Sequence, residues 1–221
     1  MEWKNDTELF ELIRNQLFTA VIGDVLDQRG RRHQFLSPDC QPLAPHMIVA
    51  GRAMTVQEED VSGVDDHQPF GLMLEALDSL EPNEVYVAAG TTRSYALWGE
   101  LMSITARARG ASGAVLAGYS RDTHGILEMD FPVFSYGRYA QDQRGRGRVI
   151  AYRVPLEIGK TIITPGEIVF GDIDGVIVIP RELETEVITE ALERSRKEKT
   201  AKQDLLHGEL AVKVFQKHGV L

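Results

Sequence analysis

The chain of 221 residues, of which 43% are hydrophobic and 26% charged, is long enough for a single domain with a substantial core. Its formal net charge of −9 argues against a nucleic-acid partner, because binding to a phosphate backbone requires a basic surface. The one cysteine, Cys40, excludes an internal disulfide and a thiolate-cluster zinc site, and it fits a reducing cytoplasm.

The N-terminal residues and the hydropathy of the chain bear on its location. The sequence from Met1 to Asp6 lacks a basic start followed by an apolar run, so we do not expect a secretory signal. No apolar run approaches the ~18 residues that a membrane span needs. We therefore expect a cytoplasmic protein without a membrane partner.

Helix and strand patterns alternate along the first half of the chain. The elements predicted there are helices over 7–17 and 20–28, a loop over 31–47, a strand over 48–56, a helix over 70–80 and a buried strand over 85–89. Two acidic runs, 58–60 and 65–67, are predicted as loops between the strand and the third helix. The second run contains His67, but the spacing matches no definite metal site, and a solvated loop is favoured.

The stretch from Gly99 to Asp122 predicts a turn, a helix, a buried strand and a charged pair at the end of that strand. Apolar residues recur at helical spacing over 100–109, with Leu101 and Ile104 among them, and the apolar run 114–117 is typical of a covered strand. Arg121 and Asp122 then follow in a loop.

This arrangement predicts a ligand site. Ligands of α/β sheets bind outside the carboxyl ends of the strands, where such a loop lies. The free amides at the start of the helix suit a carboxylate or a phosphate. The competing interpretation is that Arg121 and Asp122 form a surface ion pair of little energetic value.

Further elements are predicted in the second half: a short helix over 125–130, strands over 132–135, 149–154 and 161–164, a hairpin over 165–180 and a helix over 182–206. The four arginines Arg138, Arg144, Arg146 and Arg148 are more typical of a solvated loop than of a site. The Asp172–Gly175 string resembles part of a calcium loop but lacks the rest of its pattern, so a turn is predicted.

Glu198 lies on the apolar stripe of the C-terminal helix, where a carboxylate needs a partner. Arg194 and Lys202 stand at pairing distance along the same helix. Alternatively, Glu198 reaches a site in a neighbouring subunit.

The distribution of lysines bears on the chemistry. Catalysis through a Schiff base needs a lysine in the pocket, and no lysine occurs between Lys4 and Lys160. This composition favours a metal over a Schiff base.

Several separated motifs together resemble the family that includes the regulator of ribonuclease activity A (RraA) and the class II 4-hydroxy-4-methyl-2-oxoglutarate / 4-carboxy-4-hydroxy-2-oxoadipate aldolases. The motifs lie in order along the chain at 19–27, 49–56, 99–102, 118–122, 165–169 and 171–176. The resemblance implies one α/β domain over 1–221, an αββα-type sandwich of swivelling-domain (phosphohistidine-domain-like) topology. It also implies homotrimers or homohexamers with sites between subunits, the helix 182–206 packing at an interface.

The resemblance further implies roles for single residues. Asp122 would hold Mg²⁺ or Mn²⁺, and Arg121 would bind the pyruvoyl carboxylate or enolate oxygen. The turn of Gly99, Glu100, Leu101 and Met102 would bind substrate through backbone amides, and Glu198 of an adjacent subunit would complete the site. The family aldolases carry an aspartate at the place of Glu100, with the same twenty intervening residues before Arg121, and an acid at the place of Gly125.

The expected function is a divalent-metal-dependent lyase that cleaves a 4-hydroxy-2-oxo acid to pyruvate by a retro-aldol reaction. Arg121, Glu100 and Asp122 would be its catalytic residues, and oxaloacetate decarboxylation would pass through the same enolate. Two alternatives stay open: a non-catalytic RraA-like regulator that binds a protein partner, and a metal-dependent dehydratase that acts on a sugar acid.

Overall fold

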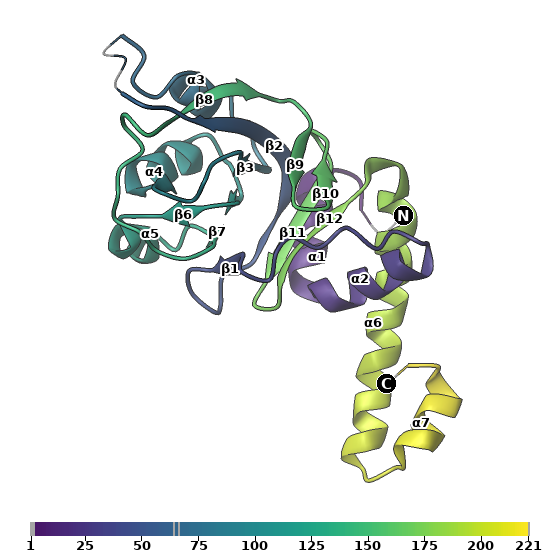
Figure 1. Ribbon diagram of the computed structural model, residues 1–221. Coiled ribbons are helices and arrows are strands. Elements are labelled where there is room, and N and C mark those ends of the chain that lie inside the picture. Colours follow the sequence, from purple (N-terminus) through teal and green to yellow (C-terminus); the bar gives the residue numbers. More distant parts are fainter. Residues whose placement is uncertain (1–2, 64, 66, 221) are drawn as a thin grey trace.

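A strongly curved sheet of eight strands is the framework of the computed structural model, which describes residues 3–63, 65 and 67–220 (Figure 1). Seven strands follow one another across this sheet: β1 (Gln41–Pro42), β7 (Val133–Ser135), β5 (Gly113–Leu116), β3 (Glu84–Ala89), β2 (Val49–Asp60), β11 (Ile168–Asp172) and β12 (Gly175–Ile179). The eighth, β8 (Gly147–Tyr152), pairs with the second half of β2. Two smaller ladders join β4 (Ala96–Trp98) to β6 (Tyr119–Ser120) and β9 (Leu156–Ile158) to β10 (Thr161–Ile163).

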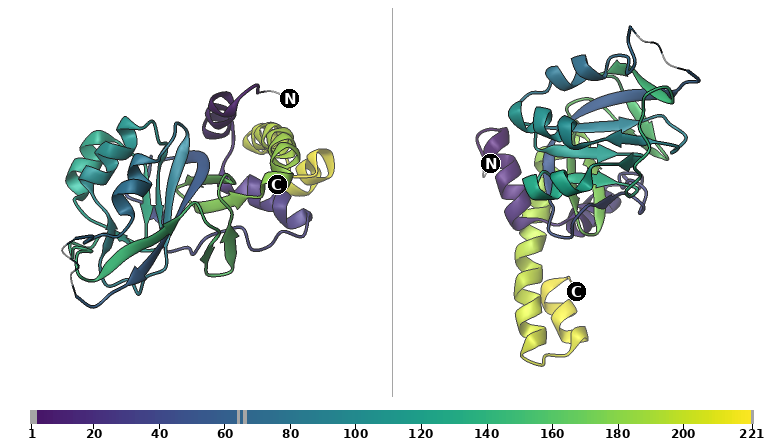
Figure 2. Two further views of the ribbon diagram at one scale, coloured as in Figure 1. Left: turned by 90° about the horizontal axis from the view of Figure 1, so that it is seen from above. Right: turned by 90° about the vertical axis from the view of Figure 1, so that its left-hand side faces the viewer.

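Helices cover the curved sheet from two sides (Figure 2). One group consists of α3 (Met73–Asp78), α4 (Glu100–Ala108) and α5 (Thr123–Met129). The other group consists of α1 (Asp6–Gln16), α2 (Thr19–Gln28) and α6 (Glu184–Leu206), which is preceded by the 3₁₀ turn η1 (Arg181–Leu183).

The strands bury both of their faces, as the sequence of β3 illustrates. Val85 and Val87 belong to the apolar cluster inside the curve, whereas Tyr86 packs toward α3, α4 and α5. On β11, Val169 enters the inner cluster and Phe170 packs against α1, α2 and α6. The expected mixed α/β domain is thereby confirmed, with a sheet that closes almost to a barrel.

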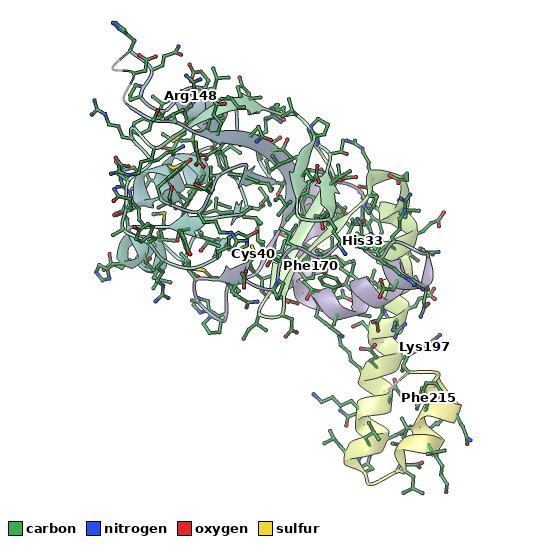
Figure 3. The ribbon with its side chains drawn as sticks, viewed as in Figure 1. His33, Cys40, Arg148, Phe170, Lys197 and Phe215 are labelled. Carbon is green, nitrogen blue, oxygen red and sulfur yellow. The ribbon has the colours of Figure 1, made fainter. Side chains whose placement is uncertain are left out.

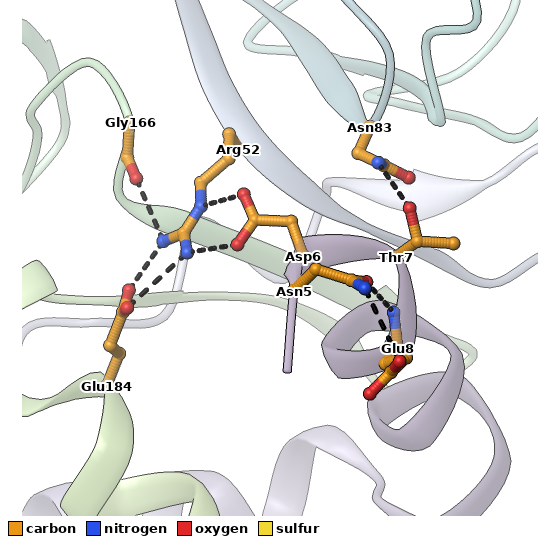
Figure 4. Close-up of polar contacts among 8 residues, drawn as sticks. All are labelled: Asn5, Asp6, Thr7, Glu8, Arg52, Asn83, Gly166 and Glu184. Atoms are coloured by element: carbon orange, nitrogen blue, oxygen red, sulfur yellow. Dashed lines mark hydrogen bonds and ion pairs between the residues drawn. The ribbon is translucent and has the colours of Figure 1, made fainter. Parts of the chain in front are cut away.

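Arg52 on β2 ties the helices of the second group to the sheet (Figure 4). Its guanidinium donates to both carboxylate oxygens of Asp6 at 2.7 and 2.8 Å, and it also donates to Glu184 and to the Gly166 carbonyl. The hydrogen bond from Arg52 lowers the pKa of Asp6. The Arg52 guanidinium therefore joins the strand to the helices, and each of its nitrogens donates a hydrogen bond.

The end of α6 projects from the body of the domain, and α7 (Ala211–His218) folds back against it (Figure 1). Figure 3 shows the contrast: Phe170 and Cys40 lie within the body, and Lys197 and Phe215 lie on the projecting pair of helices. Ala201, Val214 and Val220 form a separate small apolar cluster there. No helix among residues 3–63, 65 and 67–220 is both long and apolar enough to cross a membrane.

Several element predictions were wrong in extent. β2 continues to Asp60, so the run 58–60 belongs to a strand and not to a loop, because β8 pairs with it. α3 is shorter than the predicted helix 70–80, and α7 was not predicted.

The predicted face of α4 was also wrong. Leu101 is 76% exposed and Ile104 is exposed as well, while Ser103 and Ala106 are buried. Ser103 is tolerated in the core because its hydroxyl accepts from the Trp98 indole at 2.7 Å and donates to the Gly99 carbonyl. The small face of the helix therefore packs inward, which lets α4 approach the sheet closely.

Candidate functional site

A cleft of about 270 Å³ lies between α3 and α4, next to the β4–β6 ladder. The predicted residues Gly99, Leu101, Met102, Arg121 and Asp122 contribute to its wall. The apolar part of the wall comes from Phe70, Met73, Leu77, Leu97 and Trp98. A mostly apolar cleft with a few charged side chains that point into it is typical of a small-molecule site.

The β4–β6 ladder brings the two halves of this site together. Trp98 pairs in register with Ser120, and the Arg121 amide donates to the Trp98 carbonyl at 2.9 Å. Gly99 therefore lies beside Arg121 and Asp122, although twenty-one residues separate it from them. The turn at the start of α4 and the charged pair after β6 form one corner.

Two carboxylates flank the Arg121 guanidinium. Its Nη1 lies 3.2 Å from Asp142 Oδ1, and its Nε lies 3.6 Å from Asp122 Oδ2. The Arg121 side chain is 37% exposed, and Nη2 has no hydrogen-bond partner among the described residues. The guanidinium thus keeps donors for an anion in the cleft.

Asp122 adopts a left-handed backbone conformation, with φ 55°, immediately before α5. Such a conformation is costly for a residue with a side chain and gathers at functional sites. Gly99 lacks a side chain where one would collide, since a Cβ there would lie 2.7 Å from Asp122 Oδ2. The open approach to this carboxylate therefore depends on glycine at position 99.

Glu100 begins α4 but does not line the cleft with Arg121. Its carboxylate lies over Gly125 in the first turns of α5, where a Cβ at position 125 would stand 2.2 Å from Glu100 Cδ. No hydrogen bond or ion pair of this carboxylate occurs within the described part of the chain. The two departures from the family pattern are thus related, because Gly125 leaves the space that the longer side chain of Glu100 fills.

Sequence reasoning missed Asp142 and Gln143, which also line the cleft. They stand in a stretch whose arginines were predicted as solvated, and no motif marks them. A buried glutamine with an acid beside it is a weak signal. Only the tertiary structure shows that Asp142 contacts Arg121.

The remaining candidates have structural contacts. Arg138 donates to the Leu43 carbonyl, and Arg148 pairs with Glu59. Asp172 accepts from the Thr19 amide and hydroxyl, so the predicted turn holds α2 in place.

Two other acidic candidates lie apart from the cleft. The His67 amide donates to Asp65, whereas Asp66 lies outside the described residues, and no cluster of three metal-ligating side chains occurs in the described ranges. Glu198 pairs with Arg194 at 3.4 Å on α6, which lies on the other side of the sheet from α4 (Figure 1). It reaches no residue of the cleft within one chain.

The fold is that of a known group of proteins. The chain belongs to the RraA-like family, because the family model described as Aldolase/RraA matches residues 19–178. The projecting α7 and the first helix fall outside that matched range.

Individual proteins support the assignment. A putative 4-hydroxy-4-methyl-2-oxoglutarate aldolase of Halalkalibacterium halodurans is 28% identical over 200 residues, covering 89% of each chain. Protein DlpA of Legionella pneumophila is 30% identical over 79% of this chain, but this chain spans only 28% of that protein. The crystal structure of an uncharacterized protein from Pseudomonas syringae is 25% identical and superimposes with a TM-score of 0.85, covering 98% of this chain and 97% of the other.

Proposed function

We propose that the chain is a divalent-metal-dependent lyase that releases pyruvate from a 4-hydroxy-2-oxo acid by a retro-aldol cleavage. Oxaloacetate decarboxylation would share the same enolate. The single observation that carries this proposal is the Arg121–Asp122 corner in the cleft, where a guanidinium with free donors adjoins an accessible carboxylate. The names of the relatives support a lyase.

We assign Arg121 the role of binding the carboxylate of the 2-oxo acid. A guanidinium and a carboxylate match in geometry, and the charge of Arg121 lies where negative charge develops during cleavage. The amides at the start of α4, from Glu100 to Met102, have no acceptor within the helix and would bind the same anion. Asp142 offsets the charge of Arg121 while the cleft is free of substrate.

The donors at the corner suit a hydrated divalent cation better than a closed protein cage. Asp122 supplies a carboxylate in the cleft wall, whereas the carboxylate of Glu100 lies over Gly125. One or two carboxylates plus waters are usual for Mg²⁺. A cation bound at Asp122 would supply Lewis-acid stabilisation of the enolate. We assign Glu100 the role of a general base that accepts the proton of the 4-hydroxyl group, or of a general acid that donates a proton to the enolate.

A second copy of the chain is proposed to complete the site. Leu74 and Leu101 line the cleft and leave apolar surface exposed, and Ile104 on α4 is exposed as well. Figure 3 shows Lys197 on the projecting part of α6, and Glu198, the next residue of that helix, does not line its own cleft. Packing of the helix 182–206 of one copy near the cleft of another, in a trimer or hexamer, would cover this surface and bring Glu198 toward Arg121.

A pyruvate-release assay tests the proposal. The panel contains 4-hydroxy-2-oxo acids, oxaloacetate and a sugar acid, each measured with Mg²⁺, with Mn²⁺ and with a chelator. We expect a 4-hydroxy-2-oxo acid to release pyruvate, and we expect the chelator to abolish this release. Release unaffected by the chelator would contradict the metal assignment, and turnover of the sugar acid alone would favour a dehydratase.

The exposed leucines around the cleft also favour a second candidate, a regulator that binds a protein partner. The two functions separate in one comparison. Leu101→Asp would abolish partner binding by a regulator, whereas Arg121→Ala would abolish turnover by a lyase.

A further inference from the structure

Behind the cleft, a glutamate is enclosed in the core. Glu58 lies on β2, is 1% exposed, and stands at a bulge where the register with β8 shifts between Gln57 and Glu58. A bulge turns a side chain out of the regular alternation and often adjoins an active site. A buried carboxyl group is costly unless it is hydrogen-bonded or uncharged, so its presence calls for an explanation.

The hydrogen bond of Glu58 leads directly to the cleft. Its Oε2 accepts from Gln143 Nε2 at 2.6 Å, and Gln143 is itself buried, at 4% exposure, in the cleft wall. The neighbouring Asp142 Oδ1 accepts from the backbone N–H of Gln143 at 2.9 Å and lies 3.2 Å from Arg121 Nη1. A short chain of contacts therefore connects the core acid to the guanidinium.

We propose that Glu58 is a positioning residue of the cleft, which acts through Gln143 on the Asp142–Arg121 pair. This inference rests on the proposed function, since it takes the cleft as the substrate site. Glu58 reaches no substrate. Its role is to fix the wall that carries Asp142 and to keep that wall free of a further negative charge.

The surroundings of Glu58 favour its uncharged form. Burial, followed by the charge of Asp60 on the same strand, raises the pKa of Glu58 to about 8. Burial, followed by a charge on Glu58, raises the pKa of Tyr86 on β3. Tyr95, which precedes β4, donates to Asp60 at 3.0 Å, and Gln143 is the remaining polar neighbour. None of these groups supplies a positive charge to hold a carboxylate at position 58.

The other oxygen of Glu58 supports the same conclusion. Oε1 is buried and has no hydrogen-bond partner in the described part of the chain. The hydroxyl of Tyr86 is likewise buried without a partner there. An ionised carboxylate with an unsatisfied oxygen would be strongly disfavoured. Ionisation above pH 8 would therefore strain this wall and place a negative charge behind the binding site of an anionic substrate.

Two variants isolate the effect. Glu58→Gln has the shape of the uncharged acid and cannot ionise. Glu59→Gln is the matched control, because Glu59 is the next residue on β2 but pairs at the surface with Arg148. Any general effect of removing one carboxylate from this strand appears in both proteins.

The first readout needs no turnover. The side-chain ¹⁵N–H signals of Gln143 and Arg121 are followed by NMR from pH 6 to pH 10 in the free protein. We expect both signals to shift with one midpoint near pH 8 in the wild type and in Glu59→Gln, and to stay in place in Glu58→Gln. Should Glu58→Gln fail to fold, the carboxyl ¹³C signal of Glu58 in the wild type gives the same midpoint.

The second readout is the pH dependence of pyruvate release. The KM of the wild type and of Glu59→Gln is expected to rise about tenfold per pH unit above pH 8, and that of Glu58→Gln to stay level. Signals of Gln143 and Arg121 that do not move near pH 8, or that move equally in Glu58→Gln, would overturn the inference. Absent turnover with the NMR response intact would refute the proposed lyase alone.

Discussion

Arg52 and Arg121 each stand between two acids, and they differ in how completely they are hydrogen-bonded. Arg52 has a side chain only 14% exposed and donates to Asp6, Glu184 and Gly166. Arg121 is 37% exposed, and its contacts with Asp122 and Asp142 are longer, at 3.6 and 3.2 Å. The first guanidinium has no donor left for a ligand, whereas the second has. Spare hydrogen-bonding capacity beside a cleft, and not the presence of an ion pair, distinguishes the site from the scaffold.

The largest expected effect comes from removing the charges of the site. Asp122→Ala and Arg121→Ala should each lower kcat/KM for pyruvate release by roughly 10²-fold or more, because the stabilisation of the enolate is lost. The free energy of unfolding should change little, since both side chains are partly exposed. Steady-state kinetics and chemical denaturation of the same preparations check both statements. Wild-type turnover in Asp122→Ala would remove the basis of the metal assignment.

Arg52→Ala should have the opposite profile. The variant leaves Asp6 and Glu184 without their shared partner, and we expect a loss of about 2 kcal/mol in the free energy of unfolding, because Asp6 remains partly solvated. Turnover per folded molecule should be retained. Urea denaturation together with kinetics at a temperature below the unfolding transition measures both. A stable but inactive Arg52→Ala protein would erase the contrast between the two arginines.

The carboxylates allow a further comparison through pH. Because burial raises the pKa of Glu58 to about 8 from 4.5, the folded state holds this proton more tightly than the unfolded state. The contribution of Glu58 to stability is therefore complete below pH 4.5, declines as the pH rises toward 8 and is lost above it. Thermal unfolding between pH 5 and pH 9 should show this decline in the wild type and not in Glu58→Gln. Parallel curves for the two proteins would show that Glu58 titrates normally.

The smallest predicted change concerns the space between α4 and α5. Gly125→Ala places a methyl group where the Glu100 carboxylate lies, so that this flexible side chain must move. We expect kcat/KM to fall roughly tenfold, with little change in stability. His124→Ala, at the exposed neighbouring position, is the matched control and should leave kcat/KM unchanged. Equal activity of both variants would show that the carboxylate of Glu100 takes no part in the reaction.

Local patterns predicted most of the elements around the site, and tertiary contacts decided the rest. The strand before Gly118 and the loop at Arg121 followed from an apolar run and a glycine. The inward face of α4 could not be predicted, because Ser103 is buried only through a hydrogen bond with Trp98, which belongs to another element. The same applies to Glu58, whose acidic run resembles a loop until β8 pairs with it. Asp142 carries no motif and joins the site only through the fold.

The most direct test of the account measures whether the corner at Asp122 holds a cation. Binding of Mn²⁺ in the presence of pyruvate can be followed by the decrease of the free-ion EPR signal in the wild type, Asp122→Asn and Asp130→Asn. Asp130 pairs with His46 at the surface, outside the cleft wall, and serves as the control. The account predicts that Asp130→Asn binds Mn²⁺ as the wild type does and that Asp122→Asn binds it at least about tenfold more weakly. Equal affinity of all three proteins for Mn²⁺ would contradict it.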